Sequence, residues 1–455
     1  MPRRYTPPEG WCVQAFCFAL DPSPEQLRAI HRHFGGRRKA HNWAVATMKA
    51  DLDAFHATGA ETPKPSHFGL RKRWNAEKDG VCVNAETGCG WWREVSKEAF
   101  SEGIQSAVDG YWRWQKSRAG KLTGCGVGFP RFKKKGRDQD RCTFTTGAMR
   151  VESDRRHVTV PRVGTVRTHE TTRRVERLIA LGRAKVLSIT LRRRGDRIVA
   201  SVRVALARPQ QPCVARADSV VGVDVGVRRL ATIATPESVI ARVENPKALA
   251  RSLRELRRLN RQRSRRTKGS IRYQQANRRI SVLHASVANI RSHHIHQLTT
   301  RLAKTHGTVV VEGLDASGML RQRGLPGARA RRRGLSDAAL GETKRQLTYK
   351  CPWYGSALVV ADRFFASSKT CYGCGAVQDI AWSEHWRCAR CSTEHQRDDN
   401  AAINLARYAG GLGGVAAPVK RGAERKTGPR PAVGEDTRKR EPAPAGSDNP
   451  ERGAA

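Results

Sequence analysis

The stretch Val-Val-Gly-Val-Asp-Val-Gly, residues 220–226, sets an acidic side chain, Asp224, at the end of a short apolar run. The arrangement returns in Val-Val-Val-Glu-Gly-Leu, where Glu312 follows three valines, and a third acid, Asp398, lies in Arg-Asp-Asp-Asn-Ala-Ala. A carboxylate at the end of a buried strand is held rigidly with its oxygens toward a cleft, and two or three such acids can bind hard divalent cations. The pattern therefore predicts a metal-dependent nuclease.

The charge of the chain points to a polyanionic partner. Among 455 residues, Lys plus Arg number 85 against 41 Asp plus Glu, a formal charge of +44. A surplus spread along the chain would neutralise many phosphates and make binding strongly salt-dependent, whereas the plainer alternative is a merely soluble basic protein. No run approaches the ~20 apolar residues that span a bilayer, and the start of the chain lacks an apolar signal core. We therefore expect a cytoplasmic, nucleoid-associated bacterial or archaeal protein without a membrane partner.

Four cysteines form a metal-binding pattern. Cys371-Tyr-Gly-Cys374 and Cys388-Ala-Arg-Cys391 are two C-x2-C turns with thirteen residues between them. Four thiolates close a tetrahedral structural zinc site, which would hold a small ribbon together and leave catalysis to the carboxylates. The spacing is slightly shorter than the commonest range, so unrelated cysteines remain the alternative.

The other eight cysteines are scattered, and we expect reduced thiols rather than a disulfide framework. Only one loosely suggestive pair, Cys82 and Cys89, is found among them. They are Cys12, Cys17, Cys82, Cys89, Cys125, Cys142, Cys213 and Cys351.

The first third of the chain reads as one strand followed by helices. A strand over residues 13–20 leads into a helix that Asp21 or Ser23 can cap, and this helix carries a basic cluster with Arg37 and Arg38. Apolar residues at helical spacing predict a second helix over residues 100–114. We expect its aromatic side chains to pack in a core rather than to stack on bases.

The middle third predicts a small antiparallel β-domain. Its strands are expected at residues 158–160, 186–191 and 198–204, with Arg-Gly-Asp at 194–196 as a hairpin turn. The preceding segment Phe-Pro-Arg-Phe-Lys-Lys-Lys-Gly-Arg suits a loop on a nucleic-acid backbone, although a solvated turn is equally consistent. Its candidate contacts are Lys133, Lys134 and Lys135.

After a boundary at residues 208–212, a strand runs into Asp224 and a return strand follows at 230–234. Between residues 246 and 305 the sequence predicts two long helices, whose apolar seam packs while arginines including Arg278 and Arg279 remain free for phosphates. Short buried strands are expected at 309–311 and 358–360, and a helix begins at Asp398. From about residue 410 the composition predicts a disordered tail.

These residues resemble one known family. The chain is similar to the transposon-encoded TnpB, or OrfB, RNA-guided nucleases, relatives of the compact type V CRISPR effectors, over almost everything before the tail. The matching segments are Gly-Val-Asp224-Val-Gly-Val-Arg-Arg-Leu-Ala-Thr, Val-Val-Glu312, Arg363-Phe-Phe-Ala-Ser-Ser-Lys-Thr-Cys371-Tyr-Gly-Cys374-Gly and Arg397-Asp398-Asp-Asn-Ala-Ala-Ile-Asn. Gly313 departs from the family, which often has a second acid there, and Gln396 replaces an aspartate that is often seen.

The resemblance implies an α+β multidomain protein. Its centre would be an RNase H-like (RuvC) nuclease domain with an inserted zinc ribbon, accompanied by a helical recognition domain and a small β-barrel-like wedge domain. The implied boundaries are 1–20 for the first wedge strand, 21–120 for the recognition domain, 121–212 for the rest of the wedge, 213–409 for the nuclease domain with the ribbon at 366–396, and 410–455 for the tail.

The resemblance also implies an RNA-guided DNA endonuclease in which Asp224, Glu312 and Asp398 hold magnesium or manganese and the cysteines hold one structural zinc. The implied partners are a guide RNA from the protein's own transposon and target double-stranded DNA, while monomer and homodimer both stay open. Asp399 remains a competing third ligand. The alternative functions are a non-cleaving RNA-guided DNA-binding regulator and an accessory transposase. The candidate nucleic-acid contacts are Arg37, Arg38, Lys133, Lys134, Lys135, Arg278 and Arg279.

Overall fold

The computed structural model describes residues 5–59, 64–84, 87–122, 124–208, 214–322, 327–380 and 383–409. The predicted tail and Cys213 therefore lie outside the described residues. Within these ranges, no helix combines the length and the apolar character that crossing a membrane requires. The seven other scattered cysteines are free thiols, as predicted.

The N-terminal strand leads directly into a long helix. Strand β1 (Trp11–Asp21) precedes α1 (Pro24–Thr58), and Ser23 rather than Asp21 caps the helix. The Ser23 hydroxyl accepts from the Gln26 amide at 3.2 Å, and the Gln26 side chain accepts from the Ser23 amide at 3.0 Å. This reciprocal capping box satisfies two backbone donors that the helix start would otherwise leave free.

Two further helices complete this part of the chain. Helix α3 (Lys97–Arg118) extends the predicted second helix at both ends, and it packs closely on α1 because Gly103 has no side chain. A Cβ at Gly103 would lie 2.3 Å from the Arg37 carbonyl oxygen. Helix α2 (His67–Val81) and the 3-10 helix η1 (Trp91–Glu94) were not predicted.

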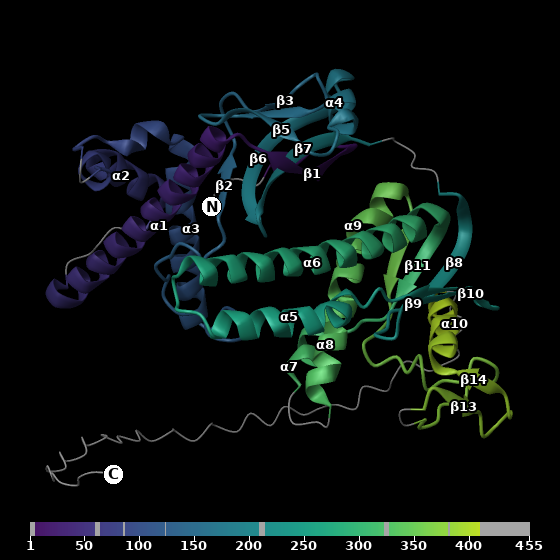
Figure 1. Ribbon diagram of the computed structural model, residues 1–455. Helices are drawn as coiled ribbons and strands as arrows, with labels where there is room; N and C mark the ends of the chain where they lie inside the picture. The colour runs from purple at the N-terminus through teal and green to yellow at the C-terminus, as the bar shows by residue number, and fades with distance from the viewer. Residues whose placement is uncertain are drawn as a thin grey trace, which may run out of the picture. The chain divides into compact units, whose positions relative to one another are not determined.

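The predicted β-domain is a seven-stranded antiparallel sheet in the order β2-β6-β7-β1-β5-β4-β3 (Figure 1). Strand β1 crosses its middle and pairs with β7 from Trp11↔Ala207 to Leu20↔Ile198. Gly195 has a φ of 68° in the predicted hairpin turn, a conformation that glycine adopts without strain. The remaining elements are β2 (Arg141–Phe144), β3 (Arg150–Val151), β4 (His157–Val160), β5 (Gly164–Thr168), α4 (Arg173–Ala180), β6 (Ala184–Arg194) and β7 (Arg197–Ala207).

A second sheet carries the predicted acids. Its order is β10-β9-β8-β11-β12; β9 is antiparallel to both β10 and β8, and β11 is parallel to both β8 and β12. The predicted return strand and both short valine-rich strands are therefore confirmed. The strands are β8 (Arg216–Asp224), β9 (Arg229–Ala234), β10 (Val239–Glu244), β11 (His306–Val311) and β12 (Ala357–Val360).

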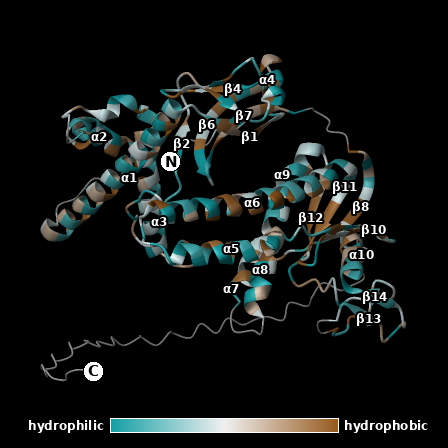
Figure 2. Cartoon of the chain, in the orientation of Figure 1, coloured by the Kyte–Doolittle hydropathy of each residue, from teal (hydrophilic) through white to brown (hydrophobic). Residues whose placement is uncertain are grey.

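The two long helices predicted between these strands are α5 (Ala248–Ser264) and α6 (Ile271–Thr305). They lie side by side with an apolar seam that includes Leu256, Leu259 and Ile280. Figure 2 shows α5 mainly hydrophilic, which agrees with its many arginines. Helices α7 (Ala316–Arg321), α8 (Ala328–Ala338) and α9 (Leu340–Tyr354) follow β11.

Candidate active site

Neighbouring strand ends bring two of the three predicted acids together. Asp224 is the last residue of β8, and Glu312 directly follows the last residue of β11. The two strands are parallel, and Val223 pairs with Val311 in their register. Because adjacent strands lie about 4.8 Å apart, Asp224 and Glu312 emerge next to each other at one edge of the sheet.

The third acid comes from the helix that covers this sheet. Asp398 lies in the first turn of α10 (Arg397–Ala409), which packs directly on β8 at Gly222. A Cβ at Gly222 would lie 2.0 Å from the Ala402 carbonyl oxygen. Since residues two apart in a strand share a face, Asp224 projects toward the side of the sheet that α10 covers.

Asp398 and Glu312 act electrostatically on Asp224, and all three carboxylates are half-buried. Burial, with like-charge repulsion from Asp398 and Glu312, raises the pKa of Asp224 to about 8, and the positive charge of Arg397 opposes this rise. Burial also raises the pKa of Glu312, again against Arg397. Crowded, partly desolvated carboxylates resist ionisation until a cation joins them, so this donor set suits a hard divalent ion.

The structure favours Asp398 over Asp399 as the third acid of the cluster. Both carboxylate oxygens of Asp399 are engaged by Arg242 of β10, at 3.0 Å from its Nε and 2.5 Å from a terminal nitrogen. A bidentate pair of this kind fixes the orientation of both groups. The amide of Asp399 donates to the Gln396 side chain at 2.8 Å. Gln396, which replaces an aspartate often seen in the family, therefore caps the start of α10.

The four predicted zinc cysteines come together. Their sulfurs all lie within 4.8 Å of one another, and Cys371–Cys391 and Cys374–Cys388 are each 3.6 Å apart. Zinc–sulfur bonds of about 2.3 Å at tetrahedral angles separate the sulfurs by roughly 3.8 Å, so the arrangement fits zinc. Within the described ranges, this is the only group of three or more histidine, cysteine or acidic side chains whose ligand atoms lie this close together. The carboxylates of Asp224, Glu312 and Asp398 do not approach one another as closely.

The ribbon around these cysteines is a small unit with its own core. Strands β13 (His385–Arg387) and β14 (Glu394–Gln396) pair antiparallel. The ring of His395 stacks against Trp386 with centroids 4.4 Å apart, and its Nε2 lies 3.1 Å from the Cys371 sulfur. A ring N–H at this distance can orient a metal-binding thiolate.

Two asparagines of α10 hold the chain that enters the ribbon. The Asn404 side chain donates to the carbonyls of Ser367 and Thr370 at 2.8 and 2.6 Å. Asn400 donates to the same two carbonyls at 3.3 and 2.7 Å, and it accepts from the Tyr372 amide at 3.1 Å. The helix that carries Asp398 is therefore attached to the first cysteine turn through buried hydrogen bonds.

Two predicted nucleic-acid contacts are corrected by the structure. Arg37 is only 5 % exposed, and its Nε lies 3.2 Å from a Glu102 carboxylate oxygen. Arg38 ion-pairs with Asp140, and both side chains are largely buried. A run of basic residues on a helix distributes over all its faces, so Arg37 and Arg38 face inward and connect α1 to neighbouring segments instead of facing a ligand.

The remaining basic candidates differ in exposure. Lys133 is half-buried, its Nζ donates to Ser106 at 2.8 Å, and burial lowers its pKa to about 8. The side chains of the other four, Lys134, Lys135, Arg278 and Arg279, are exposed. These four stay candidates for phosphate contacts, although a terminal nitrogen of Arg278 also lies 3.5 Å from a carboxylate oxygen of Asp196.

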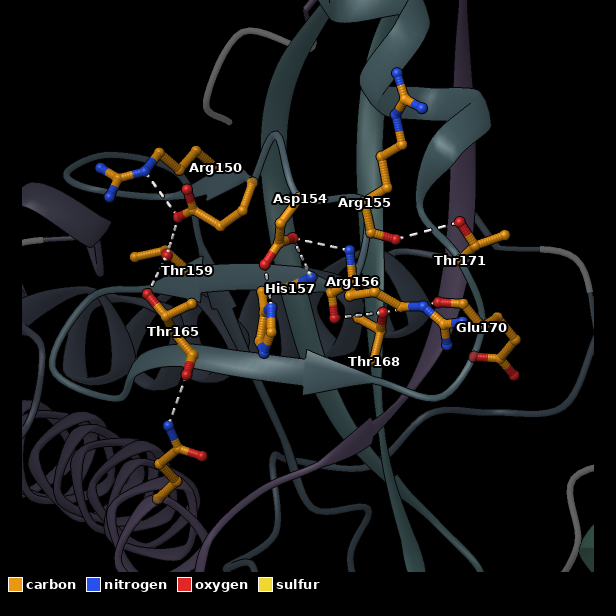
Figure 3. Close-up of polar contacts among 12 residues, drawn as sticks. Arg150, Asp154, Arg155, Arg156, His157, Thr159, Thr165, Thr168, Glu170 and Thr171 are labelled. Carbon is orange, nitrogen blue, oxygen red and sulfur yellow. Dashed lines mark hydrogen bonds and ion pairs between the residues drawn. The ribbon is translucent and has the colours of Figure 1, made fainter.

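A basic hairpin between β3 and β4 was missed by the sequence analysis (Figure 3). The Asp154 carboxylate accepts from the amides of Arg156 and His157 at 2.8 and 3.1 Å and contacts the His157 ring. These hydrogen bonds lower the pKa of Asp154, and the bond from the Arg156 amide contributes most. The turn therefore keeps exposed Arg155 and Arg156 on a fixed backbone, and its short polar sequence gave no periodicity that could have revealed it.

Three family models match segments of the chain. A model described as a probable transposase, OrfB_IS605, matches residues 201–323; a Cas12f1-like TNB domain matches 341–405; a helix-turn-helix domain matches 12–53. The last of these segments is β1 followed by one continuous part of α1 in the structure.

A protein of Mycobacterium tuberculosis with the description "Putative RNA-guided DNA endonuclease" is 63% identical over 450 residues, which are 98% of each chain. This chain belongs to the OrfB/TnpB family. InsQ of Escherichia coli, described in the same words, is 26% identical over 86% of this OrfB/TnpB chain and 91% of its own length. A Cas12f1 structure aligns with a TM-score of 0.43 at 14% identity over 88% of this chain and 99% of its own, a likeness too low to carry an argument.

Proposed function

We propose that this OrfB/TnpB protein is an RNA-guided DNA endonuclease that cuts target double-stranded DNA selected by a guide RNA from its own transposon. The observation that carries the proposal is the convergence of Asp224, Glu312 and Asp398 from two strand ends and one helix start. The names of the relatives support the choice of guide and substrate.

The architecture supports an RNase H-like, RuvC-type assignment for residues 213–409. Three antiparallel strands are followed by two parallel ones, and a helix carrying an acid packs on the first strand. We assign the ribbon at 366–396 to one structural zinc. We also propose a helical recognition domain over residues 21–120 and a wedge domain made of residues 1–20 and 121–212.

The three carboxylates supply the chemistry in this proposal. Magnesium or manganese between them would activate a water molecule and stabilise the leaving oxygen of a phosphodiester. Asp224 must first lose the proton that its raised pKa retains. The strand ends then keep the oxygens of Asp224 and Glu312 in place, and the positive charge of Arg397 limits the repulsion between them.

Sequence selection would rest on the RNA. Base pairing between guide and target reads the sequence, while the protein holds the nucleic-acid backbones. The formal charge of +44 and the exposed side chains of Lys134, Lys135, Arg278 and Arg279 suit that task, and they predict strongly salt-dependent binding.

The proposal is tested by copurifying the protein with RNA transcribed from its own locus and sequencing that RNA. The complex is then given magnesium and a DNA library with a matching target and a randomised flank. We expect cuts only in matched targets, next to one short flanking motif. Guide and target binding without cutting, in magnesium and in manganese, would instead identify a non-cleaving regulator, and joined DNA products would identify a transposase.

A further inference from the structure

One large aromatic side chain close to the acidic cluster faces solvent. Phe364 is 78 % exposed and lies in the turn that follows β12. Its neighbour Phe365, by contrast, is half-buried against the ring of Tyr408, with centroids 4.9 Å apart. Exposing a phenylalanine forgoes the favourable free energy of burying its ring, so a Phe beside the acidic cluster calls for an explanation.

The turn that presents Phe364 has a well-defined backbone. The Asp362 carboxylate accepts from the Phe364 amide at 2.7 Å, and the Asp362 carbonyl accepts from the Phe365 amide at 3.1 Å. The Asp362 amide donates to the Tyr408 hydroxyl at 3.3 Å. The ring of Phe364 therefore projects from a turn that α10 holds, rather than from a loose loop.

This turn lies against the segment that carries Glu312. The Ala361 amide donates to the Val311 carbonyl at 2.8 Å, one residue before Glu312. A Cβ at Gly313 would lie 2.6 Å from the Ala361 carbonyl oxygen and 3.3 Å from the Arg363 amide nitrogen. Gly313, which stands where the family often has an acid, thus permits the close approach of the turn to the acidic edge of the sheet.

The chemistry around the ring suits a nucleotide. The Arg363 guanidinium lies 6.0 Å from the centroid of Phe364 and 3.6 Å from a carboxylate oxygen of Asp315, and its side chain is 61% exposed. An exposed aromatic face beside an accessible cation is the combination with which proteins hold unpaired bases and their phosphates. A protein partner would leave the neighbouring positive charge without an obvious purpose.

We propose that Phe364 stacks on one unpaired nucleobase of the DNA strand whose phosphodiester lies at the acidic cluster. The inference rests on the proposed nuclease function, and it adds a substrate-binding residue to that function. Stacking on an aromatic ring is worth about 1–3 kcal/mol per base, which corresponds to roughly a 5- to 150-fold change in binding.

The test compares Phe364→Ala, Phe364→Trp and the matched control Phe68→Ala in the full-length protein purified with its guide RNA. Phe68 is 80 % exposed on α2 and so matches the exposure of Phe364. We expect Phe364→Ala to lower kcat/KM for matched DNA by about 5- to 150-fold, Phe364→Trp to keep it near the wild-type value, and Phe68→Ala to leave it unchanged.

A substrate series locates the contact. Single abasic sites are introduced at successive positions around the cut, and each substrate is given to wild type and Phe364→Ala. At one position, an abasic site should lower kcat/KM of the wild type about as much as Phe364→Ala does on intact DNA. The same abasic site should not lower kcat/KM of Phe364→Ala any further. If wild type cuts and Phe364→Ala cuts with the same kcat/KM, the stacking proposal alone is overturned. The same holds if the losses from Phe364→Ala and from the abasic site add at every position. Absence of cutting by the wild type would overturn the proposed function itself.

Discussion

Asn404→Ala tests how the catalytic helix is attached to the ribbon. Asn404 is 6 % exposed, and its side chain donates at 2.8 and 2.6 Å to the carbonyls of Ser367 and Thr370. A typical hydrogen bond contributes about 1 kcal/mol net, so losing two costs about 2 kcal/mol. The two carbonyls keep Asn400 as a donor, so the further penalty of leaving them unpaired does not arise in the single variant.

The double variant Asn400→Ala/Asn404→Ala removes both side chains that donate to these carbonyls. Its cost should exceed the sum of the two single variants, because a buried carbonyl left unpaired adds about 1–3 kcal/mol. Asn404→Asp should cost more than Asn404→Ala, since a carboxylate oxygen would face two carbonyl oxygens. The expected losses are in the local free energy that keeps residues 367–372 on α10.

Amide hydrogen exchange over residues 367–372 and 397–404 measures that free energy, alongside guide-dependent cleavage and zinc content. The matched control is Asn260→Ala, whose amide donates at 2.8 Å only within its own helix, to Leu256. We expect faster exchange and reduced cleavage in Asn404→Ala with guide RNA still bound, and no comparable change in the control. Unchanged exchange over residues 367–372 in Asn404→Ala would refute the attachment.

Three further outcomes are expected. Cys388→Ser should lose the single bound zinc and speed amide hydrogen exchange in the ribbon, and the zinc content of the purified protein measures the loss. One zinc ion per chain retained in this variant would contradict the four-cysteine site. The Arg242 side chain is 48% exposed, so Arg242→Gln should change the free energy of unfolding by under about 1 kcal/mol yet reduce cleavage. Because Arg242 and Asp399 form one ion pair, the double variant Arg242→Gln/Asp399→Asn should lose less cleavage than the two single variants together. Additive losses would contradict a role of this ion pair. Because burial and the neighbouring acids raise the pKa of Asp224 from 3.8 to about 8, the metal-free folded protein binds a proton that the unfolded chain releases, so this group's contribution to stability falls from about pH 4 to pH 8. With a chelator present, the Tm of Asp224→Asn relative to that of wild type should therefore increase as the pH rises. A Tm difference that does not change with pH would show that the pKa of Asp224 is not raised.

The sheet around the acids could be predicted because its sequence signals are local. Valine runs that end at Asp224 and Glu312 indicate buried strands, and the break at residues 267–269 separates two helices. Fixed cysteine spacing likewise predicts a metal ribbon without knowledge of the tertiary fold. Each of these features depends on residues close together in the chain.

What the sequence could not supply are contacts between distant segments. Nothing near Arg37 reveals that Glu102 lies beside it, and Arg242 is separated from Asp399 by 157 positions. The attachment of Asn400 and Asn404 to residues 367–370 is equally non-local. Helix α2 was missed because only Leu70 and Trp74 are buried in it, too few apolar positions to set a helical period.

Guide-directed cleavage by wild type and Asp224→Asn at equal guide occupancy tests the central claim most directly. The two complexes are matched by their RNA content, and each receives magnesium and linear DNA that carries the guide-matched target. The account predicts that wild type cuts at the target and that Asp224→Asn binds it equally well without cutting. Equal cleavage by both complexes would show that the acidic cluster of Asp224, Glu312 and Asp398 is not the nuclease centre.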